Sequence, residues 1–285
     1  MTARSQRYAI HNGELASLEY GNSETADISV VFLHGWLDNA ASFESVMAEL
    51  HRLNPSWHLC AIDLPGHGLS SHKGAGNFSP FHDYIDDVYQ LLVKLSPNRL
   101  VLVGHSLGAL IASCYSAAFP EQVSGLVQIE GYGPLAEKES DTVSRLREGV
   151  LSRQRIRRKP TRALTSVQDA IERRAKVNEI ESDLIAPVVK RGLVQRDGQW
   201  HWRHDVQLQS QSLYRMSLEH AHFIRQQITC PQLVVLGDQG FSHLHSFQQD
   251  ATKKTQFKVI EGGHHCHLQA PFRVSNLIFG LVNKI

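Results

Sequence analysis

The amino-acid sequence predicts an α/β protein with a mostly parallel central sheet flanked by helices. Short apolar runs rich in β-branched residues recur along the chain, and helical patterns lie between several of them. Strands that alternate with helices are typical of this fold class. The chain has 285 residues, of which 42% are hydrophobic, so it can bury a large core.

The expected strands follow one another as distinct apolar runs. Residues 8–21 (YAIHNGELASLEYG) predict two short strands joined by the turn residues Asn12 and Gly13. Residues 28–33 (ISVVFL) form a β-branched run of the kind that is buried in parallel sheets. Further runs of this type are residues 58–63, 99–104, 123–130, 231–237 and 256–262.

One helix is predicted with both of its ends. Residues 79–96 place their apolar side chains on a single helical face. We expect Ser79 to be the N-cap, Pro80 to occupy the first helical position, and Pro97 to end the helix.

Residues 133–228 interrupt the alternation of strands and helices. This segment is polar, charged and helical in pattern, without a clear strand run. It predicts an insertion between the fifth and sixth parallel strands, which leaves residues 1–132 and 229–285 as the core. Within it, residues 145–162 hold eight basic residues against one acid. We expect a solvated helix face there, with an anionic substrate or partner as the alternative.

Composition excludes several classes of protein. A formal net charge of +1 suggests neither a dedicated nucleic-acid-binding nor a membrane-surface protein. No stretch approaches the roughly 18 consecutive apolar residues of a membrane-spanning helix, and the first residues lack the apolar core of a secretory signal. Four scattered cysteines are therefore expected to be buried thiols in a cytoplasmic protein.

The strongest motif surrounds Ser106. Residues 104–108 (GHSLG) match G-x-S-x-G, directly after the strand run RLVLV and before a helix-prone stretch. In such a strand–turn–helix the flanking glycines relieve crowding, and the serine hydroxyl is exposed at a helix N-terminus. We expect Ser106 to be a nucleophile, unless this is an ordinary connection that happens to contain serine.

A serine nucleophile needs a base, and His264 has the expected position. It follows the last predicted strand in a loop that begins with Gly262 and Gly263. The alternative for this histidine-rich loop, which also contains His265 and His267, is a polar loop or a metal site. No acidic or cysteine partner has convincing ligand spacing, so no metal and no cofactor are expected.

These motifs together resemble the α/β-hydrolase family, and most closely the serine hydrolase-like proteins with a helical cap. The resemblance rests on four motifs in the family's order: His34-Gly35-Trp36, residues 63–70 (DLPGHGLS), the serine motif, and Gly263-His264 followed by Pro271. In addition, a stretch at residues 191–205 is similar to the serine hydrolase-like proteins. It implies an oxyanion hole made by the backbone N–H groups of Trp36 and Leu107, substrate contacts from Trp36 and His105, and a cap formed by residues 133–228.

The chain departs from the family pattern at the third catalytic residue, an acid. Most relatives carry an aspartate where this sequence has Gly240. Two carboxylates compete for the role: Glu130, which ends a strand next to that of the nucleophile, and Asp238, which lies earlier in the usual loop. We favour Glu130, because a rigid strand end can hold the imidazole in one tautomer.

The function predicted is hydrolysis of an ester-like bond in a small-molecule acyl substrate, through an acyl-enzyme on Ser106. Dehalogenase and epoxide hydrolase chemistry is disfavoured, because those relatives carry aspartate at the position of Ser106. Hydrolysis of a thioester, amide or carbon–carbon bond is an alternative. So is a catalytically impaired ligand-binding protein, since fold does not determine function.

Overall fold

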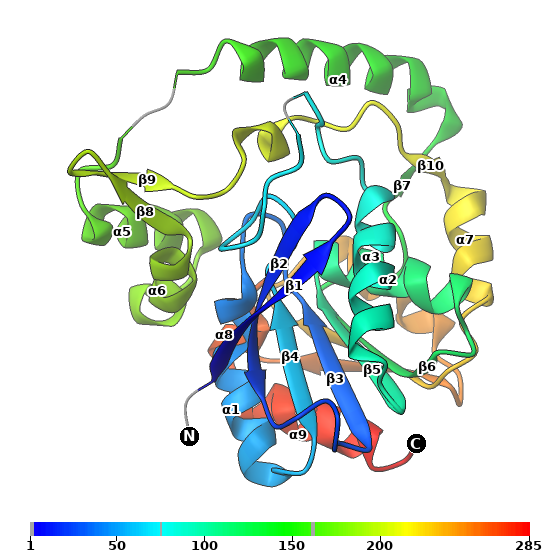
Figure 1. Ribbon diagram of the computed structural model, residues 1–285. Coiled ribbons are helices and arrows are strands. Elements are labelled where there is room, and N and C mark those ends of the chain that lie inside the picture. Colours follow the sequence, from blue (N-terminus) through cyan, green and yellow to red (C-terminus); the bar gives the residue numbers. More distant parts are fainter. Residues whose placement is uncertain (1–2, 75, 161–162) are drawn as a thin grey trace.

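The computed structural model of the chain describes residues 3–74, 76–160 and 163–285, and it has the predicted α/β architecture (Figure 1). One sheet of eight strands runs through the molecule in the order β1-β2-β4-β3-β5-β6-β11-β12. Its strands are β1 (Arg4–Ile10), β2 (Gly13–Tyr20), β3 (Ile28–Leu33), β4 (His58–Ile62), β5 (Arg99–His105), β6 (Val123–Ile129), β11 (Gln232–Gly237) and β12 (Thr255–Ile260).

The strands from β4 to β12 are parallel, and β1 and β2 form an antiparallel hairpin at one edge. The parallel strands β3 and β4 are buried along their whole length, because helices cover both faces of the sheet. The carboxyl ends of parallel strands meet at one edge of a sheet, which is where ligand sites form in open α/β folds.

Helices pack on both faces of the sheet. The core on one face includes residues of α1 (Glu44–Leu53) and α9 (Pro271–Val282). The core on the other face includes residues of α2 (Asp83–Leu95) and α3 (Leu107–Ala118). A short helix, α8 (Cys266–Gln269), precedes α9. All four cysteines are buried free thiols, as expected.

The start of α2 was predicted wrongly. The helix begins at Asp83, and Ser79 has a left-handed backbone (φ 45°) instead of capping it. Asn77 explains the difference, because its Oδ1 accepts a hydrogen bond from the Ser79 N–H at 2.8 Å and keeps residues 77–79 in a turn. The predicted end is correct, since α2 stops at Leu95 before Pro97.

Residues 133–228 follow β6, the fourth parallel strand along the chain and not the fifth as predicted. Within the described part of this segment no strand joins the central sheet. It also contains an antiparallel hairpin, β8–β9, although its sequence predicted no clear strand. Its elements are β7 (Ala136–Glu137), α4 (Thr142–Arg157), α5 (Val167–Asn178), α6 (Ser182–Arg191), β8 (Leu193–Arg196), β9 (Gln199–Trp202), β10 (Met216–Ser217) and α7 (Leu218–Gln226).

Four short 3-10 helices complete the secondary structure of the described residues: Ala40–Phe43, Glu139–Asp141, Val206–Gln209 and Ser242–Asp250. Figure 1 shows α4 lying across one end of the molecule, with α5 and α6 on one side and α7 on the other. The predicted basic run begins in α4, and its residues 161 and 162 lie outside the described residues. No helix of the described chain has the length and apolar character needed to cross a membrane.

A buried ion pair joins the segment to the core. Arg191, at the end of α6, contacts both carboxylate oxygens of Asp63, with Nη2 2.9 Å from Oδ2 and Nε 3.0 Å from Oδ1. Asp63 follows β4 and is fully buried. It also accepts hydrogen bonds from the N–H groups of Ala40 and Leu69 at 2.7 Å each. The segment is therefore anchored to the loops that lead to the site described next.

Candidate active site

Ser106 occupies a strained turn between β5 and α3. Its φ of 48° lies in the left-handed region, which costs on the order of 1–3 kcal/mol for a residue other than glycine. Its N–H donates to the carbonyl of Ile129 in the neighbouring strand at 2.9 Å, which holds the turn against the sheet. Such strain at the junction of a strand and a helix is the geometry that exposes a nucleophilic serine.

Both glycines of the motif are required by close packing. A Cβ on Gly104 would lie 2.3 Å from the backbone of Gly108, and a Cβ on Gly108 would lie 1.9 Å from the Leu33 carbonyl oxygen. Any side chain at either position would therefore open the turn or push α3 away from β3.

His264 follows β12 in the predicted loop and faces Glu130. Its Nδ1 lies 3.2 Å from Glu130 Oε2, so the Nδ1–H donates to the carboxylate and Nε2 remains free to accept a proton. The ring of Phe241 stacks against the imidazole with 4.1 Å between ring centroids. The loop itself is held by a hydrogen bond from the Gly263 N–H to Gln269 Oε1 at 2.7 Å.

Glu130 is suited to remain ionised although only 2% of it is exposed. Burial alone would raise the pKa of its carboxyl, but hydrogen bonds from His264 and from two backbone N–H groups outweigh burial and lower that pKa. The backbone donors are Gly237 at 2.8 Å and Phe241 at 3.0 Å. The Glu130 backbone is left-handed (φ 50°), which is a second strained position at this site.

Asp238, the competing carboxylate, is engaged elsewhere. Its Oδ1 accepts a hydrogen bond from the Gly262 N–H at 3.0 Å, which supports the loop that carries His264. Gly240, at the family's usual acid position, has no room for a side chain, because a Cβ there would lie 2.2 Å from Glu130 Oε1. The structure thus brings Glu130 to His264 and gives Asp238 a role in the loop.

Two backbone N–H groups are candidates for an oxyanion hole. Within the described residues, the N–H groups of Trp36 and Leu107 have no hydrogen-bond acceptor. Leu107 opens α3, where an N–H lacks an intrahelical partner and the helix dipole favours negative charge. His34 supports the loop of Trp36 by accepting from the Leu64 N–H at 2.9 Å and bonding the Gly35 carbonyl at 2.7 Å. Burial lowers the pKa of His34 to about 4, so its ring stays neutral.

Ser106 and His264 line one cavity of about 570 Å³, together with Trp36. Among the described residues no hydrogen bond joins the Ser106 hydroxyl to His264. This bond is often long in ligand-free hydrolases and shortens when substrate binds. Trp36 is 51% exposed, and its Nε1–H donates to the Leu208 carbonyl in the inserted segment at 2.9 Å.

His105, which was expected to contact the substrate, lies beside the backbone of His264. Only 1% of it is exposed, and its Nε2–H donates to the backbone carbonyl of His264 at 2.8 Å. Burial, followed by the charges of the neighbouring His267, His264 and His265, holds the pKa of His105 well below its usual value. The neutral ring thus supports the His264 backbone. Because His105 also lines the active-site cavity, the substrate contact expected of it stays a prediction.

Sequence reasoning missed a buried cluster behind His105. Asp38 Oδ2 accepts from His265 Nε2 at 3.1 Å, and Arg174 of α5 contacts Asp38 Oδ1 at 2.8 Å. The possible metal-ligand atoms of Asp38, His105 and His265 lie close enough to hold a metal ion, but Arg174 already supplies a positive charge to Asp38. No local sequence pattern indicates this cluster, because its residues come from distant parts of the chain. A second group with metal-ligand spacing, Glu19, His58 and Cys60, lies in β2 and β4.

The fold and the site place the chain in one family: it belongs to the alpha/beta hydrolase fold family, whose sequence profile matches residues 28–271. It is 28% identical to a serine hydrolase-like protein of Danio rerio over 93% of this chain and 84% of the relative. It is 33% identical to a pimeloyl-[acyl-carrier protein] methyl ester esterase of Pectobacterium carotovorum over 40% of this chain and 41% of the relative. A hypothetical protein of Pseudomonas aeruginosa has the same fold, with a TM-score of 0.86, 28% identity and coverage of 97% of this chain and 99% of that one. The chain is thus a hydrolase-family protein close to the serine hydrolase-like proteins.

Proposed function

We propose that the protein is a serine hydrolase that cleaves an ester-like bond through an acyl-enzyme on Ser106. The observation that carries the proposal is the pairing of His264 Nδ1 with Glu130 Oε2 at 3.2 Å, in the cavity that Ser106 also lines. This pairing leaves Nε2 as the proton acceptor, which is the tautomer that a general base for serine requires.

In this mechanism His264 takes the proton of Ser106 as the hydroxyl oxygen attacks the acyl carbon. The N–H groups of Trp36 and Leu107 stabilise the negative oxygen of the tetrahedral intermediate. Glu130 stabilises the imidazolium, and His264 then gives the proton to the leaving group. Water repeats the sequence on the acyl-enzyme, which releases the acid and frees Ser106.

We further propose that residues 133–228 act as a cap over the site, on a core of residues 1–132 and 229–285. Support comes from Leu208, which accepts the hydrogen bond of the Trp36 indole, and from Arg174, which contacts Asp38 beside the active-site cavity. Such a cap would exclude water from the reacting groups.

An ester substrate is supported by the chemistry of the site and by the similarity to the Pectobacterium methyl ester esterase. Thioesters, amides and carbon–carbon bonds pass through a similar oxyanion intermediate and are the alternative substrates. We expect a small-molecule acyl substrate and a cytoplasmic location. An impaired binding protein is not favoured, because the relatives include serine hydrolase-like proteins and an esterase, and candidates for the base, the acid and the oxyanion donors are all present.

The test is labelling with a fluorophosphonate probe and hydrolysis of a short nitrophenyl ester. We expect labelling at Ser106 and a fall in kcat of about 10⁶ in Ser106→Ala, as for other serine nucleophiles. Ser113→Ala on α3 is the matched control, since the Ser113 hydroxyl bonds the Leu110 carbonyl away from the cavity. A Ser106→Ala protein that keeps more than about a hundredth of wild-type activity contradicts the proposal.

A further inference from the structure

A second cavity adjoins the active-site cavity at Trp36. It has a volume of about 350 Å³, and Trp36 and Leu107, the two candidate oxyanion residues, lie in its wall. The other lining residues are mainly aromatic and aliphatic side chains from residues 78–84 and 208–216. An acyl group held at Ser106 can therefore extend past the oxyanion site into apolar surroundings.

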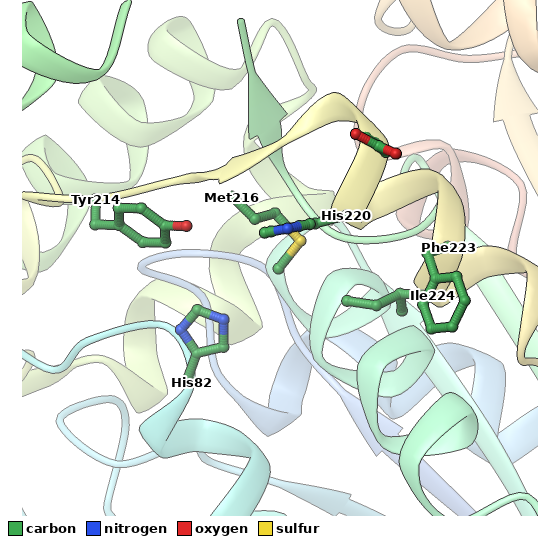
Figure 2. A pocket seen from close by; sticks show the side chains of 7 residues that line it. His82, Tyr214, Met216, His220, Phe223 and Ile224 are labelled. Atoms are coloured by element: carbon green, nitrogen blue, oxygen red, sulfur yellow. The ribbon is translucent and has the colours of Figure 1, made fainter. Parts of the chain in front are cut away.

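The path continues to the surface beside α7. A third cavity of about 580 Å³ shares His82, Tyr214 and Met216 with the second one. Figure 2 shows Tyr214 and His82 on one side, Met216 beside His220 near the centre, and Phe223 and Ile224 of α7 on the other side. The two cavities thus form one passage, suited to an elongated arm of a substrate.

Two arginines stand out in this apolar passage. Arg153 of α4 and Arg215 both line the second cavity. Among the described residues neither forms an ion pair, and the Nε atom of each is buried without a hydrogen-bond partner. The Arg153 guanidinium lies over the ring of Phe78, 4.6 Å from its centroid, and that of Arg157 lies over the same ring at 5.2 Å.

Two nearby carboxylates, Glu137 and Glu148, pair with a different arginine, Arg145. Glu137 pairs with Arg145 at 2.8 Å, and Glu148 lies 3.9 Å from the same guanidinium. Burial is the first cause that lowers the pKa of Arg153 and of Arg215, and a neighbouring arginine lowers each pKa further, whereas Glu137 and Glu148 raise that of Arg215. Both side chains stay protonated at neutral pH, so the passage holds two partly buried positive charges, while the one carboxylate among the described residues that lines it, Glu219, lies in the outer cavity.

We propose that the substrate carries an anionic group, a carboxylate or a phosphate, on the arm that occupies this passage, and that Arg153 and Arg215 bind it. The proposal rests on the proposed hydrolase function. A planar guanidinium binds either anion through paired charge-assisted hydrogen bonds, and the apolar walls strengthen such bonds. Substrates of this chemistry include half-esters of dicarboxylic acids and acyl groups attached to a phosphate-bearing carrier arm.

The experiment compares matched substrates in matched variants. One pair consists of the mono-nitrophenyl ester of a dicarboxylic acid and the nitrophenyl ester of the fatty acid of equal chain length. A third substrate is an acyl thioester of phosphopantetheine. The variants are Arg153→Met and Arg215→Met, with Arg155→Met as the control, because Arg155 lies on α4, is exposed and lines neither cavity.

We expect wild-type protein to prefer an anionic substrate. Each cavity variant should then lose about tenfold to a hundredfold in kcat/KM on that substrate, as for a lost hydrogen bond to a charged group, and keep its activity on the neutral ester. Loss on the half-ester identifies a carboxylate, and loss on the thioester alone identifies a phosphate. Equal losses on neutral and anionic substrates, or the same loss in Arg155→Met, overturn the proposal.

Binding of the dicarboxylic acid and of phosphopantetheine to Ser106→Ala protein, measured by calorimetry, separates this proposal from the hydrolase function. Binding that disappears in the Arg153→Met background supports the anion site even if no ester is turned over. Turnover of esters without any dependence on Arg153 or Arg215 leaves the hydrolase function intact and refutes the anion site. Absence of both anion binding and arginine dependence also refutes it.

Discussion

Glu130 and Gly240 are linked by the space they share. The carboxylate of Glu130 occupies the volume that a side chain at position 240 would need, since a Cβ there would lie 2.2 Å from Oε1. An acid on the loop after β11 would therefore require the Glu130 carboxylate to move from its observed position. The glycine at position 240 leaves room for that carboxylate beside His264.

Substitution of the two candidate acids should lower kcat to very different extents. Glu130→Gln should lower kcat by about 10⁴, because an amide favours the wrong tautomer of the base. Asp238→Asn should cost about tenfold or less, since asparagine keeps the Oδ1 acceptor for the Gly262 N–H. Both are measured in one nitrophenyl ester assay, with thermal melts to check folding. A severe Asp238→Asn and a mild Glu130→Gln would reverse the assignment.

Exchanging the acid tests the steric link directly. Gly240→Asp alone should inactivate and destabilise the protein, because its side chain collides with Glu130. Adding Glu130→Gly removes the collision and suits the positive φ at position 130. The double variant should therefore regain at least tenfold in kcat over Gly240→Asp. Equal activities of the single and the double variant would show that the two positions are independent.

At the level of elements, the sequence predicts the sheet well and the inserted segment poorly. Buried parallel strands are continuous apolar runs, so their positions follow from the local sequence pattern, whereas the start of α2 depends on one Asn77 hydrogen bond. The sequence does contain a signal for the β8–β9 hairpin, namely Asp197-Gly198, which forms a turn with positive φ at both residues. No sequence signal predicts the pairing of Arg174 and Arg191 with core aspartates, because this pairing depends on how distant segments pack.

The ion pair between Arg191 and Asp63 should contribute strongly to stability. Arg191→Met leaves a fully buried carboxylate without its cation, which costs about 3–5 kcal/mol. The control is Arg173→Met, whose exposed helical pair with Asp169 is expected to contribute less than about 1 kcal/mol. Urea unfolding of both variants gives the two free energies. Similar losses in the two variants would show that the inserted segment is not anchored through Asp63.

At the scale of the whole molecule, the most distinctive property is a set of neutral buried histidines. The chain has 17 histidines, and sequence position singled out only His264 among them as a base. Burial is the first cause that lowers the pKa of five others: well below its usual value for His105, to about 4 for His34, and to about 3 for His67, His204 and His267. No sequence pattern predicts this, because it arises from packing against neighbours that are far away in the chain.

These histidines make stability depend on pH. In the unfolded chain each binds a proton below about pH 6.5, whereas in the folded protein each stays neutral well below that pH, and those with a pKa of about 3–4 stay neutral until the pH falls to that range. Between these values the unfolded state binds more protons, so acidification favours unfolding. The lowered pKa values of Glu19, Asp38 and Glu130 act in the same direction only below about pH 4.5.

The free energy of unfolding should therefore fall by at least about 5 kcal/mol between pH 7 and pH 5.5, because His34, His67, His204 and His267 each approach 1.4 kcal/mol per pH unit and His105 adds to the fall. Urea titrations at half-unit steps of pH measure the slope. His267→Gln should reduce it by about one proton, because glutamine does not titrate, whereas the exposed His220→Gln should leave it unchanged. A wild-type slope of less than about two protons, or the same slope in His267→Gln, would mean that these rings are already accessible to protons in the folded state.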